Sequence, residues 1–125
     1  MLNEIHNNIT HIWELEAKCS LDEAKKFYSE TASKYAHELG EKGQLRFEWY
    51  VDEDKKSATF IENYKDINAV KERIKNHLNS HLKDEFPAKF DIKKLIVLGN
   101  LSPEMKKEYE GFGASFREKI GGFLK

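Results

Sequence analysis

Residues 45–64, LRFEWYVDEDKKSATFIENY, contain two strand patterns separated by a short polar loop. The runs 45–51 and 58–64 are rich in aromatic and β-branched residues, which favour the extended conformation. Apolar and polar side chains alternate along both runs, as expected of strands that bury one face. The polar stretch between them, DEDKKS, is short enough for a hairpin loop. Together these features predict a β-hairpin, around which the rest of the chain can be arranged.

The segment before the hairpin predicts one strand followed by one helix. Residues 11–19 alternate apolar and charged side chains, which indicates a strand with one solvated face. Ser20 and Glu23 form a capping box, and the helix that it opens carries its apolar residues at spacings of three and four. Gly40 then ends this helix.

The segment after the hairpin predicts a second helix, a further strand and a short third helix. Asp66 caps the second helix, which runs to about Lys83 before Pro87 prevents its continuation. Residues 90–99 form the strand, and Ser102 with Pro103 begins the third helix. An apolar tail follows, and its large side chains are Phe116, Ile120, Phe123 and Leu124.

The predicted order of elements is β-α-β-β-α-β, followed by a helix and the apolar tail. This order predicts an α+β fold, a ferredoxin-like βαββαβ antiparallel sheet with helices on one face. We expect a single domain over residues 1–125, with its core at about 9–99 and the C-terminal helix and apolar tail at 102–125.

The composition excludes several classes of protein. Lysine and arginine (21) nearly balance aspartate and glutamate (22), so no net charge favours nucleic acid or an anionic membrane surface. No apolar run approaches the roughly 20 residues that cross a bilayer, and we expect no signal peptide before the first strand. The single cysteine, Cys19, cannot form an internal disulfide. We therefore expect a cytoplasmic protein with no nucleic-acid or membrane partner.

The second face of the predicted sheet is more apolar than a solvated face should be, because helices can cover only one face. A second copy of the same sheet is the simplest cover, since most soluble oligomers are symmetric homodimers. Singly exposed aromatic side chains are the alternative. To this face we assign Arg46, Glu48, Tyr50, Phe60, Glu62 and Tyr64.

Two further expectations follow for such a homodimer. Charges at the interface need partners, so we expect Arg46 to pair with Glu48 or Glu62. The apolar segment 112–124 follows the core elements, and we expect it to dock on the partner subunit. The alternative is a tail that folds back onto its own helices.

Residues 43–73 carry a specific order of motifs: a glycine, an L-x-F-E strand, an acidic hairpin, a strand ending in E-x-Y, and a helix opened by an acidic residue and A-V. In this order the chain resembles the antibiotic-biosynthesis-monooxygenase-like proteins of the dimeric α+β barrel superfamily. The resemblance implies a ferredoxin-like fold that forms a dimeric α+β barrel. The matching positions are Gly43, Leu45, Phe47, Glu48, Asp52, Phe60, Glu62, Tyr64, Asp66, Ala69 and Val70.

The resemblance implies a range of activities rather than one set of catalytic residues. The family includes cofactor-free quinol and anthrone oxygenases as well as haem-degrading enzymes. Many members carry a histidine a few residues after the A-V pair, where this chain has Arg73. The Asn, Trp and His set of the haem-degrading branch has no match here, because Trp49 and Asn63 lie in strand patterns.

Two histidines of the second helix pattern are the candidate catalytic residues. At about 100° per residue, His77 and His81 fall in the middle of its apolar arc, next to Ile74. Three interpretations are open: buried histidines with internal hydrogen bonds, a small-ligand pocket, or a metal site, for which i and i+4 is suitable spacing. No H-E-x-x-H motif or third ligand accompanies the pair, so we predict no metal. His6, His11 and His37 are expected at the surface.

The first helix pattern favours the pocket. Tyr28, Thr31 and Tyr35 place three hydroxyl groups on its inward face, and buried hydroxyls need partners that water or a ligand can supply. Ordinary packing, with each hydroxyl reaching the rim, is the alternative. With Trp49 and Ile74, these residues are the candidate substrate-binding set, suited to a flat aromatic molecule.

The resemblance and the inward histidines together predict a function. We expect a cofactor-independent monooxygenase that acts on a small quinol-like or phenol-like aromatic substrate and needs no cofactor. His77 or His81 would be the base, since imidazole titrates near neutrality. The alternative is a non-catalytic small-ligand-binding protein, or a structural homodimer of the same fold.

Overall fold

A five-stranded sheet and one layer of helices make up most of residues 7–123, the part of the chain that the computed structural model describes. The strands are β1 (Ile9–Ala17), β2 (Gln44–Asp52), β3 (Ser57–Tyr64), β4 (Phe90–Leu98) and β5 (Ala114–Arg117). The helices are α1 (Leu21–Lys26), η2 (Phe27–Ala32), α2 (Ser33–Leu39), α3 (Ile67–Leu78), α4 (Leu82–Lys89), α5 (Pro103–Lys106) and η3 (Lys107–Tyr109).

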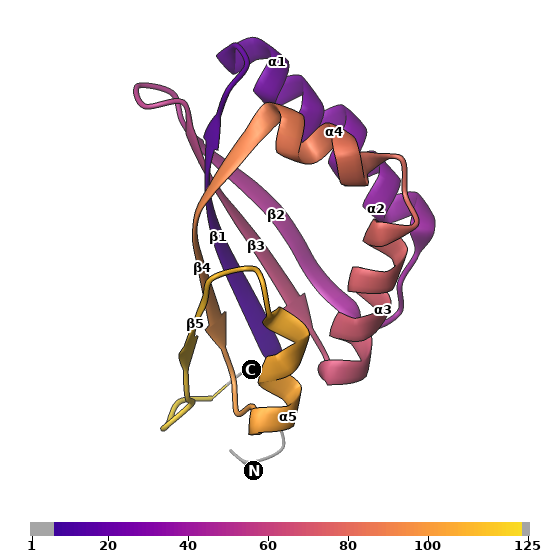
Figure 1. Ribbon diagram of the computed structural model, residues 1–125, viewed down its shortest axis with the longest axis vertical. Coiled ribbons are helices and arrows are strands. Elements are labelled where there is room, and N and C mark those ends of the chain that lie inside the picture. The colour runs from indigo at the N-terminus through magenta and orange to yellow at the C-terminus, as the bar shows by residue number, and fades with distance from the viewer. Residues whose placement is uncertain (1–6, 124–125) are drawn as a thin grey trace.

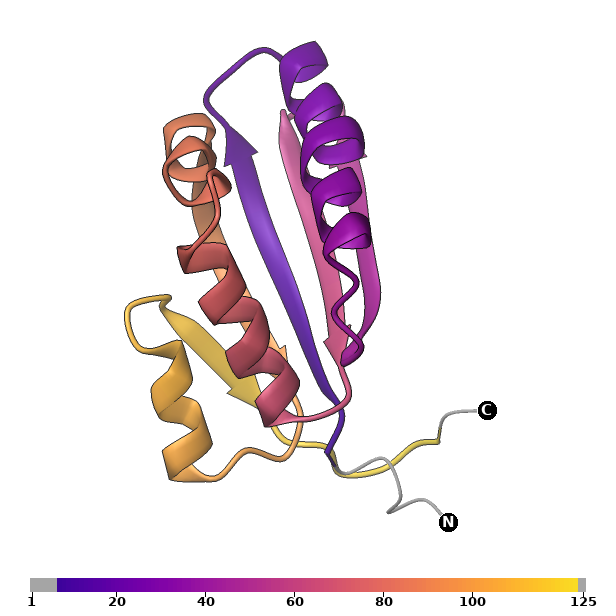
Figure 2. The same cartoon turned by 90° about the vertical axis from the view of Figure 1, so that its right-hand side faces the viewer.

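The first four strands confirm the predicted ferredoxin-like topology. The strand order of the sheet is β2-β3-β1-β4-β5, and the first four strands are antiparallel to their neighbours. The long helices lie side by side on one face of this sheet (Figures 1 and 2). β5 runs parallel to β4, so the sheet is mixed rather than purely antiparallel. The fold is therefore ferredoxin-like α+β with one added edge strand.

The helix between β1 and β2 begins and ends where the sequence predicts but contains an unexpected π-helical turn. Ser20 caps its start by accepting a hydrogen bond from the Glu23 amide at 3.2 Å. Gly40, with φ of 63°, ends it in the left-handed conformation. Between them, η2 is π-helical, and the Tyr28 carbonyl accepts hydrogen bonds from the Ser33 amide and hydroxyl groups. Such turns are rare and occur frequently at functional sites.

The second long helix is interrupted, so the predicted continuous helix to Lys83 is wrong. α3 begins at its Asp66 cap and ends at Leu78. The Ser80 hydroxyl donates to the His77 carbonyl at 2.8 Å and accepts from the Leu82 amide at 3.2 Å. These local hydrogen bonds replace those of a continuing helix, and α4 starts after His81.

The strand registers also overturn the predicted assignment of the sheet faces. Residues paired across antiparallel strands share a face, and Glu62 pairs with both His11 and Phe47. Phe60 and Tyr64 flank Glu62 on the same face, and all three are buried. The half of the expected interface that comes from β3 therefore lies beneath the helices.

Of the residues predicted to lie on the outer face of the sheet, only those from β2 lie there. Tyr50 pairs with Thr59 rather than Phe60, and a difference of one residue in register reverses the face of every side chain. Tyr50 is exposed, and so are Arg46 and Glu48. Arg46 forms the expected ion pair with Glu48, within one strand.

Two buried clusters hold the helices to the sheet. One surrounds Tyr64, Val70, Leu95 and Val97, beneath α3. The other joins the first helix and α4 to the sheet edge, and its buried members are Ala24, Phe27, Tyr28, Ala32, Ala58, Leu82 and Phe90.

The C-terminal segment belongs to its own subunit for most of its length. Ser102 caps α5 as predicted, β5 completes the sheet, and Phe116 packs on the cluster around Tyr64. This contradicts docking of residues 114–117 on a partner. Ile120 and Phe123 are exposed, and Leu124 lies outside the described residues.

A glycine substitution tests the packing of β2 against α3. A Cβ atom at Gly43 would overlap the Cβ atom of Ala69, so Gly43→Ala should lower the free energy of unfolding by about 1–3 kcal/mol in urea titrations. Gly121→Ala is the matched control, because no described atom lies within 4 Å of its added Cβ. Equal stability of the two variants would contradict this packing.

Candidate functional site

A buried hydrogen-bond network around Glu62 occupies the helix-covered face of the sheet. The Glu62 carboxylate accepts hydrogen bonds from His11 Nδ1 at 3.1 Å, from Trp13 Nε1 at 2.7 Å and from the Tyr64 hydroxyl. With Nδ1 as the donor, His11 Nε2 accepts from the Tyr109 hydroxyl at 2.7 Å. The network thus joins β1, β3 and the C-terminal segment.

The network holds Glu62 as an anion. Burial alone would raise the pKa of Glu62, but the hydrogen bond from His11, aided by those from Tyr64 and Trp13, outweighs it and lowers the pKa below its ordinary value. Burial, followed by the charge of Glu62, raises the pKa of both Tyr64 and Tyr109. The two tyrosines therefore stay protonated as donors.

His77 lies on α3 across from this network. Its ring is half-buried, lies 6.5 Å from the Phe86 ring, and interacts electrostatically with Glu62. Burial, followed by the positive charge of Arg73, lowers the pKa of His77, and the charge of Glu62 only partly opposes this. His77 is therefore neutral at pH 7, the state that a general base requires.

Arg73 lies one turn before His77 and is held by a second buried carboxylate. Glu41 Oε2 lies 3.5 Å from Arg73 Nη1 and accepts a hydrogen bond from Asn76 at 2.7 Å. The Glu41 side chain is 3% exposed and that of Arg73 is 13% exposed. The arginine found where the resembled family often has a histidine thus acts on His77 through its charge.

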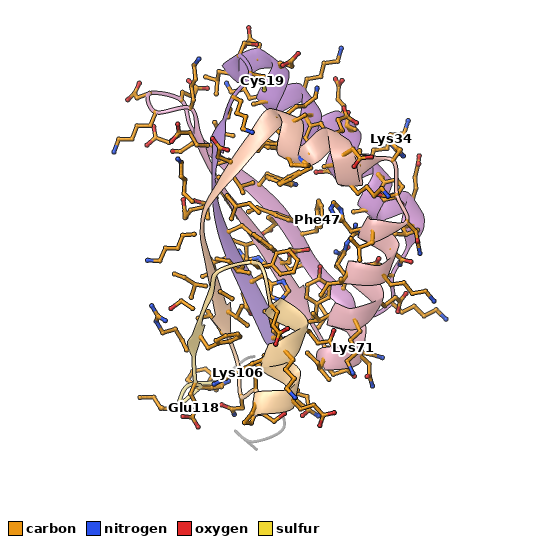
Figure 3. The ribbon with its side chains drawn as sticks, viewed as in Figure 1. Cys19, Lys34, Phe47, Lys71, Lys106 and Glu118 are labelled. Carbon is orange, nitrogen blue, oxygen red and sulfur yellow. The ribbon has the colours of Figure 1, made fainter. Side chains whose placement is uncertain are left out.

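Aromatic side chains line the sheet opposite α3. Figure 3 shows Phe47 projecting from the sheet toward the helix layer. Phe47 and Trp13 share the face of Glu62, and both remain half-buried although helices cover this face. Ile74 of α3 packs with Trp13 against the cluster around Tyr64. A molecule between His77 and the sheet would meet these apolar groups.

The two predicted catalytic histidines are not brought together. Because α3 ends at Leu78, His81 lies at the start of α4, where it is exposed and contacts Tyr35 edge-on at 5.4 Å. The expectation that both histidines point toward the sheet is therefore wrong for His81. Thr31 is half-buried in the π-helical turn.

The structure does bring Tyr28 and Trp49 together, in a stack of four rings. Their centroids are 4.3 Å apart, Phe60 covers the other face of Trp49 at 3.9 Å, and Phe90 covers the other face of Tyr28 at 4.9 Å. Neither ring has a face left for a substrate. Only their edges remain, and the Tyr28 hydroxyl and Trp49 Nε1 are buried with no hydrogen-bond partner among residues 7–123.

His11 and Glu62 are the residues that sequence reasoning missed. His11 was expected at the surface but is 4% exposed, and Glu62 was expected on the outer face. The signal was present in both strands. His11 has the same alternation as the apolar residues Trp13 and Leu15, and Glu62 the same as Phe60 and Tyr64.

No metal centre is evident in the part of the chain that the structure describes, where no three His, Cys, Asp or Glu side chains cluster suitably for an ion. Among the same residues, no helix has the length and apolar character needed to cross a bilayer.

Several solved structures share this fold. The crystal structure of MupZ from Pseudomonas fluorescens aligns with a TM-score of 0.78 and 17% identity, over 95% of each chain. SnoaB, a cofactor-independent oxygenase from Streptomyces nogalater, aligns with a TM-score of 0.57 and 14% identity, over 77% of this chain and 95% of that chain. A conserved protein from Methanosarcina mazei Go1 gives 0.54 and 18%, over 81% and 100%.

These similarities confirm the ferredoxin-like α+β fold of the single chain, which the resemblance to antibiotic-biosynthesis-monooxygenase-like proteins implied. At such low identities they establish the fold alone. No family model and no curated protein matches the sequence.

Substitution of Glu62 tests the network through the pH dependence of stability. The lowered pKa of Glu62 stabilises the fold fully above about pH 4.5, its ordinary value, and this contribution is lost as the pH falls through the folded-state pKa. Glu62→Gln should lower the free energy of unfolding by about 3 kcal/mol at pH 7 and flatten its decline below pH 4.5.

Urea titrations between pH 3 and about 7 measure both effects. Glu30→Gln, at an exposed site on η2, is the control and should keep the wild-type stability and slope. A Glu62→Gln variant as stable as the control would show that the network contributes nothing.

Proposed function

We propose that this protein is a cofactor-independent oxygenase that acts on a small phenolic or quinol-like aromatic, with His77 as its base. The main observation behind the proposal is the half-buried imidazole of His77 on α3, which interacts electrostatically with Glu62 and is kept neutral at pH 7 by its lowered pKa. The shared fold with SnoaB, itself a cofactor-independent oxygenase, supports the same class of reaction.

The proposed reaction uses the substrate as its own source of electrons. His77 takes the phenolic proton, and the resulting phenolate transfers one electron to dioxygen. The radical pair combines to form a carbon–oxygen bond and hence a peroxide. Cleavage of the oxygen–oxygen bond, with loss of the ring hydrogen and return of the proton from His77, gives a quinone and one molecule of water. One oxygen atom enters the product and the other leaves as water.

The protein would contribute binding and charge stabilisation. Ile74 on one side and Trp13 with Phe47 on the other would hold the aromatic ring, as apolar walls do in most small-molecule sites. The nearby positive charge of Arg73 would favour the phenolate over the phenol once the proton has moved. Thr31 and Tyr35 remain proposed contacts on the first helix.

Oxygen-uptake assays with a panel of hydroquinones and anthrones test the proposal. His77→Ala should reduce kcat/KM by about 100-fold or more, because it removes the general base. The wild-type kcat/KM should rise with pH through the pKa of the free His77, so the acidic limb should lie below the ordinary value of 6.5.

His37→Ala, at an exposed site on α2, is the matched control and should retain wild-type uptake. His81→Ala separates the two candidate bases, since a loss confined to that variant would assign the base to His81. Full turnover by a protein lacking both His77 and His81, or no turnover of any substrate in the panel, would contradict the proposal.

Ligand binding without turnover is the second candidate function. The hydrogen bonds of the Glu62 network favour this function. Both ring nitrogens of His11 and both carboxylate oxygens of Glu62 already have partners within the protein. A thermal-shift screen with the same aromatic panel distinguishes the two functions. Stabilisation by compounds that are recovered unchanged in air would favour binding.

We also propose that two subunits associate through the outer face of the sheet. Ile61, Ile12 and Ile96 form an apolar row across β3, β1 and β4 on this face, and Tyr50 is 51% exposed beside them. Sedimentation equilibrium should give twice 14.6 kDa. Ile12→Lys should give a monomer, because a charge at the centre of the row cannot be paired there.

Leu78→Lys is the control for the dimer, since Leu78 is 59% exposed at the end of a helix on the opposite layer. It should remain dimeric. A monomeric wild-type protein at micromolar concentration would exclude the interface.

A further inference from the structure

A second candidate site lies at the edge of the sheet, beside the π-helical turn. A hollow of about 310 Å³ opens there between the first helix and β2. This volume is at the lower end of the range for small-molecule pockets. The hollow is lined by Lys25, Tyr28, Ser29, Ser33, Trp49 and Val51.

Two of the lining residues carry polar groups with unsatisfied hydrogen-bonding capacity. The Tyr28 hydroxyl and Trp49 Nε1 are buried and have no hydrogen-bond partner among the described residues. Leaving a buried polar group unpaired is destabilising, and native proteins rarely do so without a bound partner or a functional reason. Here two such groups belong to rings that stack on one another and border the same hollow.

The remaining polar groups of the hollow define which ligand chemistry would fit. The Ser29 and Ser33 hydroxyls already donate to the backbone carbonyls of Lys25 and Tyr28. Lys25 forms an ion pair with Glu53 at the exposed rim. Beyond these contacts, the unpaired polar groups of the lining residues are two neutral donors, the phenol and the indole, which are buried at the wall of the hollow. A ligand would therefore need to present acceptor atoms, and two such donors suit the two oxygens of a carboxylate.

The apolar surface of the hollow restricts the chemical groups that the rest of the ligand can carry. Both faces of the Tyr28 and Trp49 rings are covered by protein, so a ligand would meet ring edges and the Val51 side chain. A small molecule with an apolar body and one carboxylate matches this surface. We propose that the hollow binds a small organic carboxylate, to which the Tyr28 hydroxyl and Trp49 Nε1 donate hydrogen bonds.

This hollow is separate from the His77 site. Phe86 contacts the His77 ring at 6.5 Å and the Phe90 ring at 5.2 Å, and Phe90 in turn contacts Tyr28 at 4.9 Å. The Phe47 ring also contacts Trp49 edge-on at 6.1 Å, so aromatic side chains link the two regions, but neither His77 nor Phe47 lines the hollow. The proposal stands whether or not the protein is an oxygenase.

The indole resonances of the two tryptophans provide a direct test. In ¹H–¹⁵N spectra of the whole protein, titration with benzoate should move the Trp49 Nε1–H signal downfield in a saturable manner. The Trp13 signal should stay in place, because that indole already donates to Glu62 at 2.7 Å. Two tryptophans in the chain give two indole signals, so the second is an internal control.

Tyr28→Phe removes only the hydroxyl and tests the second donor. It should weaken benzoate binding by about tenfold, the value of one hydrogen bond to a charged group, without lowering the melting temperature of the free protein. Tyr50→Phe is the matched control, since the Tyr50 hydroxyl donates to Glu48 on the outer face, and it should bind benzoate as the wild type does.

Three results would overturn the proposal. The first is a benzoate titration that moves neither indole signal, or moves that of Trp13 alone. The second is an equal response to inorganic phosphate, which would indicate a general anion site rather than a carboxylate site. The third is unchanged benzoate affinity in Tyr28→Phe.

Discussion

The buried charge of Glu62 is the constraint on which the interior of this protein depends. An ionised carboxylate beneath a helical layer is tolerated only with hydrogen-bond donors around it, because its desolvation costs several kcal/mol. The donors come from two strands: His11 and Trp13 on β1, and Tyr64 on β3. A slip of one residue between these strands would turn His11 and Trp13 away from Glu62, so the network reinforces the register that the apolar pattern favours.

The same network explains why the chain continues beyond the four core strands. Tyr109 donates to the nitrogen of His11 that faces away from Glu62, and so satisfies the last polar atom of the ring. η3 and β5 carry this tyrosine and Phe116 onto the cluster around Tyr64. The C-terminal segment is therefore part of the interior of its own subunit, and removing it would leave a buried imidazole nitrogen unpaired.

The layer of helices that covers the sheet contains two departures from regular helix geometry. The π-helical turn places Tyr28 in the four-ring stack, while the break after Leu78 separates His81 from His77. As a result one histidine faces the buried carboxylate and the other faces solvent. Neither departure follows from the spacing of apolar residues, and together they determine which side chains can reach a ligand.

The sequence is sufficient to predict the order of the first four strands, the helix caps at Ser20, Asp66 and Ser102, and the fold class, because these depend on local patterns; it does not predict β5. The sequence does not predict features that depend on tertiary contacts, such as which face of the sheet a side chain occupies. Tyr50 and Phe60 look alike as exposed aromatics until the hairpin register places them on opposite faces.

The candidate site was predictable only in part, for the same reason. His77 follows from helix periodicity, whereas the burial of His11 depends on a carboxylate 51 residues away. The alternation of apolar residues places position 11 on the buried face, although histidine is polar. Glu62 makes this burial tolerable because it accepts a hydrogen bond from His11. A buried hydrogen bond of this kind has no sequence signature beyond the alternation that both residues share with their neighbours.

The pH at which Glu62 takes up a proton is the most direct test of the buried network. The carboxyl carbon resonance of Glu62, followed by NMR as the pH is lowered, reports its protonation in the folded protein. The pKa of Glu62 should lie below its ordinary value of 4.5, because the hydrogen bonds from His11, Tyr64 and Trp13 outweigh the effect of burial. A Glu62 that titrates above 4.5, and so is protonated more readily than an exposed glutamate, would contradict this expectation.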